Sequence, residues 1–231
     1  IAAVGRDWVD YEAWLKRHGV DTSHVLVSEK LHTATFMVTT DTELNQIASF
    51  FPGAMSEARN IELEPIMAKS GKFDLLVIST DDPEAMIIEG AKYLFLNEYE
   101  LALAIQKTGW TDRQLFDRVQ VRVVTLGSKG AQIEEHGKET IYVGVPKEKE
   151  KVDPTGVGDN FRSGFIAGLS WGLGHERCGQ LGSLLATYCI ETTGTQEYRF
   201  TKDEFLSRFE TAYGKAAADE VRPHLNVRLA G

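Results

Sequence analysis

The sequence predicts an α/β fold, and three observations support this class. Nearly continuous apolar runs over 73–79, 93–96 and 121–126 are typical of strands buried on both faces of a parallel sheet. Helical periodicity at 98–107 and 112–118 separates the last two runs, which gives the strand–helix–strand alternation of α/β proteins. Long amphipathic segments then fill the C-terminal part of the chain.

The N-terminal part predicts a helix and a small separate sheet. Residues 10–18 place aromatic and aliphatic side chains on one helical face, and Gly19 ends that helix. Residues 31–39 and 45–51 are rich in β-branched and aromatic types, which favours two strands. A polar segment joins them, so we expect a small sheet apart from the main body.

The C-terminal part predicts a strand pair and three helices. Residues 131–145 form strands on either side of Gly137 in this interpretation. The predicted helices cover 159–173, 177–192 and 202–213.

Composition excludes several classes of function. Hydrophobic residues make up 42% and charged residues 26% of the 231 residues, as in globular proteins with a buried core. The net charge of -9 without a basic stretch argues against a nucleic-acid partner. No apolar run reaches the roughly 20 residues that span a bilayer, so we expect no membrane partner and a cytoplasmic location. The two cysteines, Cys178 and Cys189, are expected to be core residues of one helix.

Two places in the sequence suggest absent segments. The chain begins with Ile1 in what resembles the end of a strand, so we expect a preceding N-terminal segment. Only residues 81–92 connect the first two apolar runs. A crossover between parallel strands needs about a dozen residues at minimum, and it usually contains a full helix with a loop at each end. We therefore expect a segment to be missing near 81–92 as well.

The strongest local signal is a glycine-rich turn that leads into a helix, Asp153-Pro-Thr-Gly-Val-Gly-Asp159. Gly156 and Gly158 allow successive backbone N–H groups to point at one place, where the helix start adds positive potential. Such a turn suits a phosphate group or the charge on a transferred phosphoryl group. Asp159 would face that anion and could accept the proton of an attacking hydroxyl. Taken alone, the pattern favours an N-cap or first-turn carboxylate for Asp159, because glycine-rich turns before helices are common.

This turn resembles the Asp-Thr-x-Gly-Ala-Gly-Asp signature of the ribokinase-like (PfkB) carbohydrate kinases. The resemblance implies that the amides of Gly156, Val157 and Gly158 form an anion hole and that Asp159 is the catalytic base beside the substrate hydroxyl. It also implies that Thr155 contacts the nucleotide.

Two further segments resemble the family in the same order along the chain. Asn97-Glu-Tyr-Glu100 is similar to its Asn-x-x-Glu motif, which implies that Asn97 and Glu100 organise Mg²⁺ and phosphate, with Glu100 as the metal residue. Taken alone, the segment reads as a helix N-cap with first-turn acids.

The second segment is Val124-Thr-Leu-Gly-Ser-Lys-Gly-Ala131. It resembles the strand and turn along the nucleotide, with Thr125, Gly127 and Gly130 as contacts, or in isolation a hairpin turn. ATP and Mg²⁺ are the implied cofactors, together with a monovalent cation such as K⁺ in some members.

Within the family, the chain most resembles the actinobacterial-type adenosine kinases from Gly5 to about Ala216. This implies a three-layer αβα ribokinase-like core with a mostly parallel sheet, formed by 1–30 and 52–231. It also implies a β-sheet lid at 31–51, which covers the sugar site and joins two copies in a homodimer. Phe36 and Phe50 resemble the aromatic residues that sandwich the purine, although either could be sheet core. The implied reaction is transfer of the γ-phosphate of ATP to the 5′-hydroxyl of adenosine.

Two departures from the family pattern keep alternatives open. The family's N-terminal aspartate and Gly-Gly-Asn segment, which bind sugar hydroxyls, have no counterpart here. Asn160 stands where a small residue usually follows the catalytic aspartate. Alternative functions are a kinase for another sugar, such as ribose or fructose, and an inactive family member that binds nucleotide. A dinucleotide-binding oxidoreductase is disfavoured, because no Gly-x-Gly-x-x-Gly follows a first strand.

Overall fold

The computed structural model describes residues 1–43, 45–71, 75–78 and 91–225. The chain divides into two compact units, an N-terminal unit over 1–87 with 230–231, and a C-terminal unit over 88–229. The units combine helices with parallel and antiparallel strands, so the predicted α/β class is confirmed. None of the helices within these described ranges is long and apolar enough for a membrane span.

The N-terminal unit contains two small sheets. β1 (Ala3–Val4) pairs in parallel with β2 (Leu26–Val27), and β3 (Thr35–Thr40) pairs antiparallel with β4 (Gln46–Phe51). The predicted small sheet is therefore present. The helices of this unit are the predicted α1 (Val9–Arg17), α2 (Leu63–Ser70) and the 3₁₀ segments Arg6–Trp8 and Gly53–Asn60.

The predicted strand over 73–79 is wrong for its described part. Residues 75–78 have no regular secondary structure, and their four apolar side chains are exposed. A strand buried on both faces needs hydrogen-bonding neighbours, and no described strand pairs with these residues. The other positions of that run lie outside the described residues. So does nearly all of the segment 81–92, expected to be incomplete.

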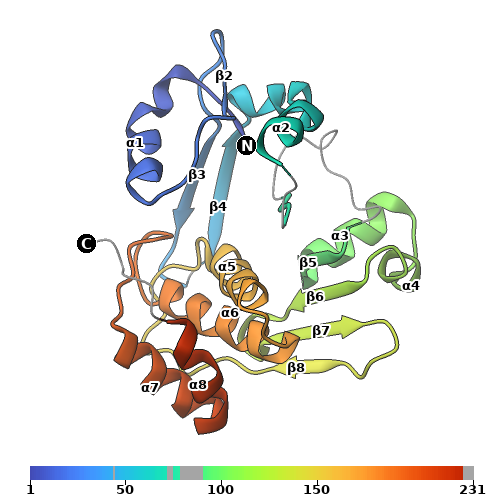
Figure 1. The fold of residues 1–231 in the computed structure, drawn as a ribbon, viewed down its shortest axis with the longest axis vertical. Helices are drawn as coiled ribbons and strands as arrows, with labels where there is room; N and C mark the ends of the chain where they lie inside the picture. The colour runs from blue at the N-terminus through green and yellow to red at the C-terminus, as the bar shows by residue number, and fades with distance from the viewer. Residues whose placement is uncertain (44, 72–74, 79–90, 226–231) are drawn as a thin grey trace. The chain divides into compact units, whose positions relative to one another are not determined.

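The C-terminal unit is built on a four-stranded sheet in the order β5-β6-β7-β8 (Figure 1). β5 and β6 are parallel, and the two following pairs are antiparallel. The strands are β5 (Tyr93–Asn97), β6 (Val121–Thr125), β7 (Ala131–Glu135) and β8 (Ile141–Val143), close to the predicted ranges.

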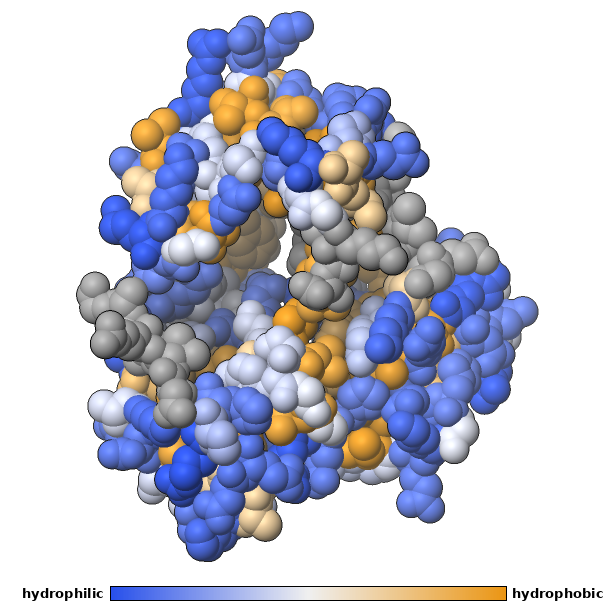
Figure 2. All heavy atoms as spheres, viewed as in Figure 1, coloured by the Kyte–Doolittle hydropathy of each residue, from blue (hydrophilic) through white to orange (hydrophobic). Residues whose placement is uncertain are grey.

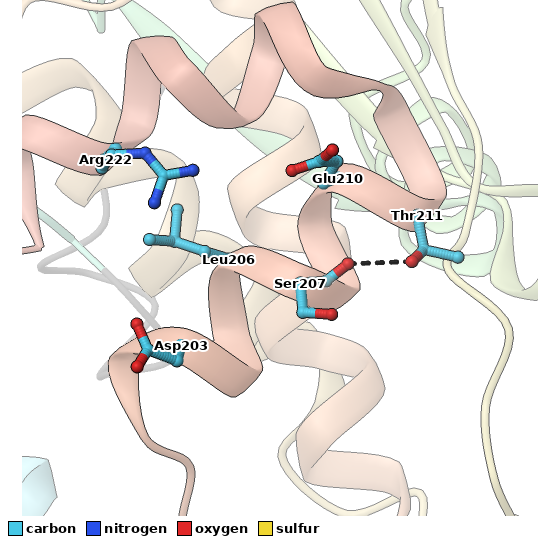
Figure 3. Close-up of a pocket in the computed structure, with 6 residues that line it drawn as sticks. All are labelled: Asp203, Leu206, Ser207, Glu210, Thr211 and Arg222. Atoms are coloured by element: carbon cyan, nitrogen blue, oxygen red, sulfur yellow. Dashed lines mark hydrogen bonds between the residues drawn. The ribbon is translucent and has the colours of Figure 1, made fainter.

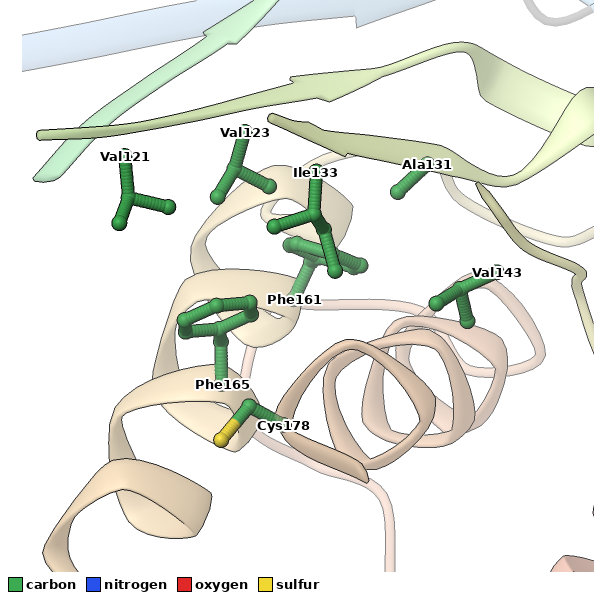
Figure 4. Packing of buried hydrophobic residues seen from close by; sticks show 8 residues of the cluster. All are labelled: Val121, Val123, Ala131, Ile133, Val143, Phe161, Phe165 and Cys178. Carbon is green, nitrogen blue, oxygen red and sulfur yellow. The ribbon is translucent and has the colours of Figure 1, made fainter. Parts of the chain in front are cut away.

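Helices cover both faces of this sheet. The helices are α3 (Glu98–Thr108), α4 (Asp112–Phe116), α5 (Val157–Ser170), α6 (His175–Ile190), α7 (Lys202–Tyr213), α8 (Lys215–Val221) and the 3₁₀ turns Gly127–Lys129 and Arg222–His224. On one face, Val123 and Ile133 pack on Phe161 and Phe165 of α5 (Figure 4). On the other, buried Arg122 reaches Asp112 at the start of α4. The unit is therefore a three-layer αβα arrangement.

A second apolar cluster joins α6 to the two C-terminal helices. Leu184 and Tyr188 of α6 pack against Phe205, Phe209 and Val221. Both predicted core cysteines lie in α6 and are fully buried. The outward side of α7 and α8 is mostly hydrophilic, as Figure 2 shows for the C-terminal unit. The apolar residues of these helices therefore serve the core.

Helices α5 and α6 approach each other closely through glycines. A Cβ atom at Gly164 would lie 2.7 Å from the carbonyl oxygen of Leu181 and 2.8 Å from the backbone of Gly182. A Cβ atom at Gly182 would lie 2.5 Å from the carbonyl oxygen of Phe161. These obstacles are backbone atoms, which cannot move aside without separating the helices.

We therefore expect Gly164→Ala to lower the free energy of unfolding by about 2 kcal/mol or more, the usual cost of overpacking a core. Urea denaturation followed by circular dichroism measures this change. Gly144→Ala is the matched control, because a Cβ atom there meets nothing within 4 Å. Equal stabilities of the two variants would contradict the close helix contact.

Candidate active site

The glycine-rich turn is held from behind by the carboxylate of Asp153. One oxygen accepts the backbone N–H of Thr155 at 2.9 Å, and the other accepts that of Gly194 at 3.0 Å. The N–H of Thr155, followed by that of Gly194, keeps the pKa of Asp153 below its ordinary value, because both stabilise the charged form. Asp153 therefore ties the turn to the loop that follows α6.

Gly156 is required where the turn enters α5. Its φ of 80° and ψ of 1° lie in the left-handed region, which side chains with a Cβ atom rarely adopt. The methyl group of Thr195 also lies 2.8 Å from where a Cβ atom would stand. Both the backbone conformation and the packing therefore select glycine. Helix α5 starts at the next residue, so its first N–H groups open at this turn.

Asp159 lies in the first turn of α5 with its side chain 69% exposed. Its carboxylate pairs with the guanidinium of Arg162, one turn further along the helix. It is thus a solvent-accessible carboxylate at the positive end of a helix, beside the glycine turn. This is the position that a base for an incoming hydroxyl needs.

Asn97 and Thr125 end two adjacent parallel strands and are directly paired in register. The side-chain hydroxyl of Thr125 donates to the carbonyl oxygen of Leu96 at 3.5 Å. Ligands of α/β proteins commonly bind outside the carboxyl ends of such strands. The structure thus brings together two of the sequence-predicted nucleotide residues at one sheet edge.

The start of α5 points toward the same edge. Phe165, in the middle of α5, contacts both Tyr93 and Phe95 of β5. His175, which follows the end of α5, donates to or accepts from the Tyr93 hydroxyl at 3.2 Å, at the beginning of β5. The helix therefore runs antiparallel to β5. Its glycine turn lies toward the carboxyl ends of β5 and β6, where Asn97 and Thr125 lie.

Asn97 and Glu100 form a reciprocal capping box at the start of α3. The side-chain oxygen of Asn97 accepts the N–H of Glu100 at 2.8 Å, and a carboxylate oxygen of Glu100 accepts the N–H of Asn97 at 2.8 Å. The capping interpretation of this motif is thus present in the structure. It leaves the second carboxylate oxygen of Glu100 outside the box, at the positive end of α3.

The segment after β6 is shaped by two glycines. Gly127 and Gly130 have φ values of 58° and 97°, and a 3₁₀ turn spans 127–129 between them. A Cβ atom at Gly130 would overlap the carbonyl oxygen of Val143 at 1.9 Å. Gly130 therefore brings the turn against β8. This segment is a tight hairpin turn, the second interpretation that the sequence left open.

Phe36 and Phe50 lie directly opposite each other in the β3–β4 hairpin of the N-terminal unit. They are 56% and 49% exposed, so neither is a core residue. Residues opposite each other share one face of a hairpin. The two exposed phenylalanines thus lie on the same face of the hairpin.

The described residues suit magnesium only together with phosphate. No group of three or more acidic, histidine or cysteine side chains among them could hold a metal ion. Mg²⁺ in phosphoryl-transfer sites takes one or two carboxylates plus phosphate oxygens and waters. Glu100, with one oxygen in the capping box, fits such a partial donor set.

Several residues of the turn's support were not predicted as site residues. They are Asp153, Cys189, Thr195 and Tyr198. The thiol of Cys189 donates to the carbonyl oxygen of Thr155 at 3.4 Å, and burial raises its pKa to about 11, so it stays protonated. There was little indication of these residues in the sequence. Three of them lie at the end of α6 and in the loop after it, 189–198, far from the glycine-rich motif along the chain.

A separate depression between α7 and the 3₁₀ turn Arg222–His224 has no such chemistry. Its lining is Asp203, Leu206, Ser207, Glu210, Thr211 and Arg222 (Figure 3). Arg222 is already 3.5 Å from the carboxylate of Asp219. None of these residues belongs to a sequence-predicted motif. The glycine turn is therefore the better candidate site.

The lowered pKa of Asp153 predicts a pH-dependent contribution to stability. A carboxylate with a depressed pKa in the folded state stabilises it above the unfolded pKa of about 4, and this contribution is lost as pH falls through the folded pKa. Asp153→Asn should therefore destabilise the chain at pH 7, with a smaller difference from wild type at pH 3. Urea midpoints across this range measure it. A difference that stays constant down to pH 3 would contradict the assignment.

Comparisons with known proteins identify the family of this chain. The model of the pfkB family carbohydrate kinases matches residues 1–88 and 67–201. A nucleoside kinase of Methanocaldococcus jannaschii is 29% identical over 238 aligned residues, which cover 91% of this chain and 78% of that protein. Adenosine kinase of Schizosaccharomyces pombe is 39% identical over a shorter stretch, 42% of this chain and 28% of that enzyme.

A solved structure is similar over nearly the whole chain. The nucleoside kinase of Burkholderia thailandensis in complex with inosine superposes with a TM-score of 0.85 and 28% identity, covering 93% of this chain and 82% of that one. Together with the family match, this confirms the predicted ribokinase-like fold and the predicted family. The chain belongs to the pfkB family of carbohydrate kinases, which are phosphotransferases.

Proposed function

We propose that this chain is an ATP-dependent nucleoside kinase that transfers the γ-phosphate to the 5′-hydroxyl of adenosine, giving AMP and ADP. The observation that carries the proposal is the glycine turn at the start of α5, followed in the first turn by the exposed carboxylate of Asp159. Adenosine follows from the sequence resemblance, and the partial match to an adenosine kinase supports it. The inosine complex of the structural neighbour makes inosine the next acceptor to assay.

Asp159 acts as the base in this mechanism. Its carboxylate takes the proton of the 5′-hydroxyl while that oxygen forms a bond to the γ-phosphorus and the bond to the β-phosphate oxygen breaks. Arg162 pairs with the same carboxylate and holds its position on α5. Because Asp159 is exposed, a hydroxyl can reach it without displacing core side chains.

The N–H groups of Gly156, Val157 and Gly158 provide the anion hole. They open at the helix start, where the helix dipole favours negative charge. Preorganised donors of this kind stabilise charge that develops in the transition state. Asp153 and Thr195 fix the turn before substrate arrives, so little reorganisation is needed during the reaction.

The nucleotide contacts are assigned to the sheet edge and the two turns. Thr125, Gly127 and Gly130 follow β6, and Thr155 precedes the anion hole. Asn97 and Glu100 complete the set. Glu100 would be the protein residue that holds Mg²⁺, together with oxygens of the bound phosphates. When bound, Mg²⁺ supplies positive charge to the transferring phosphoryl group. A monovalent cation such as K⁺ remains a prediction from the resemblance.

Phe36 and Phe50 are assigned to the acceptor base. A flat purine binds well against aromatic faces, and this pair is both exposed and preorganised by strand pairing. The segment 31–51 would then act as the lid of the acceptor site.

We also propose that this lid supports a homodimer. The opposite face of the hairpin exposes Met37, Ile47 and Phe51, which are 65%, 81% and 57% exposed. A two-stranded hairpin is at best marginally stable by itself in water, so covering its second face with another copy would stabilise it.

Asp159→Asn tests the catalytic assignment. We expect kcat to fall by about 10²–10⁴-fold, the usual contribution of a general base, while the affinity for ATP is retained. A coupled ADP assay with adenosine, inosine, cytidine, ribose and fructose measures turnover. Asp117→Asn is the matched control, since Asp117 pairs with Arg113 on another helix surface.

The same panel separates the candidate functions. Turnover of ribose or fructose but not of nucleosides would replace the nucleoside assignment with that of a sugar kinase. Absence of turnover of every acceptor by a wild-type chain that binds ATP would indicate an inactive nucleotide-binding member.

Phe36→Ala and Phe50→Ala test the acceptor assignment. Each should raise the KM for adenosine roughly three- to tenfold with kcat little changed, because an aromatic pair contributes about 0.5–1.5 kcal/mol. Thr39→Ala is the control on the opposite face of the same hairpin. Unchanged KM values in both phenylalanine variants would remove them from the acceptor site.

A further inference from the structure

Asn160, the residue after the proposed base, makes a complete set of buried hydrogen bonds. It is 7% exposed. Its side-chain nitrogen donates to the carbonyl oxygens of Gly156 at 2.9 Å and Thr195 at 3.0 Å. Its side-chain oxygen accepts the hydroxyl of Tyr198 at 2.6 Å. Asn160 thus faces the supporting loop, and its amide does not crowd the phosphate side of the turn.

The chemistry of the partners fixes the orientation of this amide. Carbonyl oxygens can only accept, so the Asn160 nitrogen must face Gly156 and Thr195. The oxygen is then left for the hydroxyl of Tyr198. Burial raises the pKa of that hydroxyl, so it keeps the proton that it donates. No other common side chain of this size supplies two donors and one acceptor in this arrangement.

The carbonyl of Gly156 is the point where this network meets the anion hole. It accepts the backbone N–H of Asn160 at 2.9 Å as well as the side-chain nitrogen. In a trans peptide the N–H lies opposite the C=O, so fixing this carbonyl along the helix fixes the direction of the Val157 N–H. That N–H has only a long contact, 3.4 Å, with the carbonyl of Pro154. It therefore remains available to a stronger acceptor.

The loop side of the network is equally constrained. The carbonyl of Thr195 accepts from Asn160, while its methyl group fills the space over Gly156. Gly194, the preceding residue, donates to Asp153. The loop 194–198 therefore contacts the turn through Gly194 and Thr195, and it contacts the start of α5 through Tyr198.

We propose that Asn160 and Tyr198 are positioning residues that hold the Gly156–Val157 peptide in the orientation of the anion hole. The inference deepens the proposed kinase function and rests on it. It explains why a polar residue can occupy a position where a small one is usual. The amide makes one directed hydrogen bond to the turn, at Gly156, and one to the supporting loop, at Thr195.

Tyr198→Phe is the least disruptive test, because it removes one hydroxyl and keeps the ring. We expect kcat to fall about tenfold, the rate effect of roughly one buried hydrogen bond, with KM for ATP and for the acceptor within about twofold. Such a split indicates an interaction made in the transition state. Tyr213→Phe is the matched control: its hydroxyl donates to the carbonyl of Gly144 at 2.8 Å, away from the turn, and its kcat should not change.

A double-variant cycle separates positioning from general stabilisation. Asn160→Ala should also lower kcat, and Tyr198→Phe should add little further loss in the Asn160→Ala background, because the two act through one network. Wild-type kcat in both single variants, or losses that multiply independently, would overturn the proposal. If Asn160→Ala does not fold, Tyr198→Phe against Tyr213→Phe decides the question.

Hydrogen exchange of the full chain without ligands tests the positioning role without any acceptor, because it measures the order of the turn directly. Peptides over 154–159 should exchange faster in Tyr198→Phe than in wild type and in Tyr213→Phe. If wild type turns over no acceptor, the proposed function fails. The exchange measurement then still tests whether Asn160 and Tyr198 order the turn. Unchanged exchange together with unchanged kcat would assign Tyr198 to packing alone.

Discussion

The close contact between α5 and α6 is the constraint on which the candidate site depends. Gly164 and Gly182 let the two backbones meet, and any Cβ atom at either position would overlap backbone of the partner helix. The start of α5 carries the glycine turn, and the end of α6 leads into the loop that supports it. The register of one helix against the other therefore decides whether Thr195 lies over Gly156.

The proposed anion hole has carboxylates close to it. Two acids flank the turn, and each is already offset by local partners. Asp153 accepts two backbone N–H groups and faces the supporting loop, whereas Asp159 pairs with Arg162. In the proposed site, the positive end of α5 can still favour phosphate, because fixed donors of the protein offset part of the nearby negative charge.

The sequence predicted those features of the fold that depend on local periodicity. The runs that became β5 and β6, and the helix over 202–213, have a pattern that one element can express by itself. The apolar run around 75–78 has the same pattern and forms no strand, because a strand also needs a neighbour that local sequence does not specify. The prediction of a buried strand therefore failed at 75–78, where none of the described strands pairs with the segment.

In the candidate site too, the features set by local sequence could be predicted, and those set by tertiary packing could not. Gly156 could be identified from its motif, since a turn before a helix imposes a left-handed conformation on that residue. The role of Asn160 could not, because its three partners include Thr195 and Tyr198, which come near it only after α6 has packed on α5. For Asn97 and Glu100 the sequence allowed two interpretations. The capping box satisfies the first and still leaves an oxygen for the second.

The proposed acceptor and phosphoryl-transfer residues belong to different units of the chain. Phe36 and Phe50 lie on a hairpin whose residues are largely exposed, whereas the glycine turn is built on a buried helix pair. In the proposed function, the hairpin determines which base is bound, whereas Asp153 and Asn160 make their hydrogen bonds within the C-terminal unit. Catalysis of phosphoryl transfer is therefore the more constrained property. If the hairpin holds the acceptor base as proposed, acceptor preference depends on an exposed surface, where substitutions are tolerated more easily than in a core.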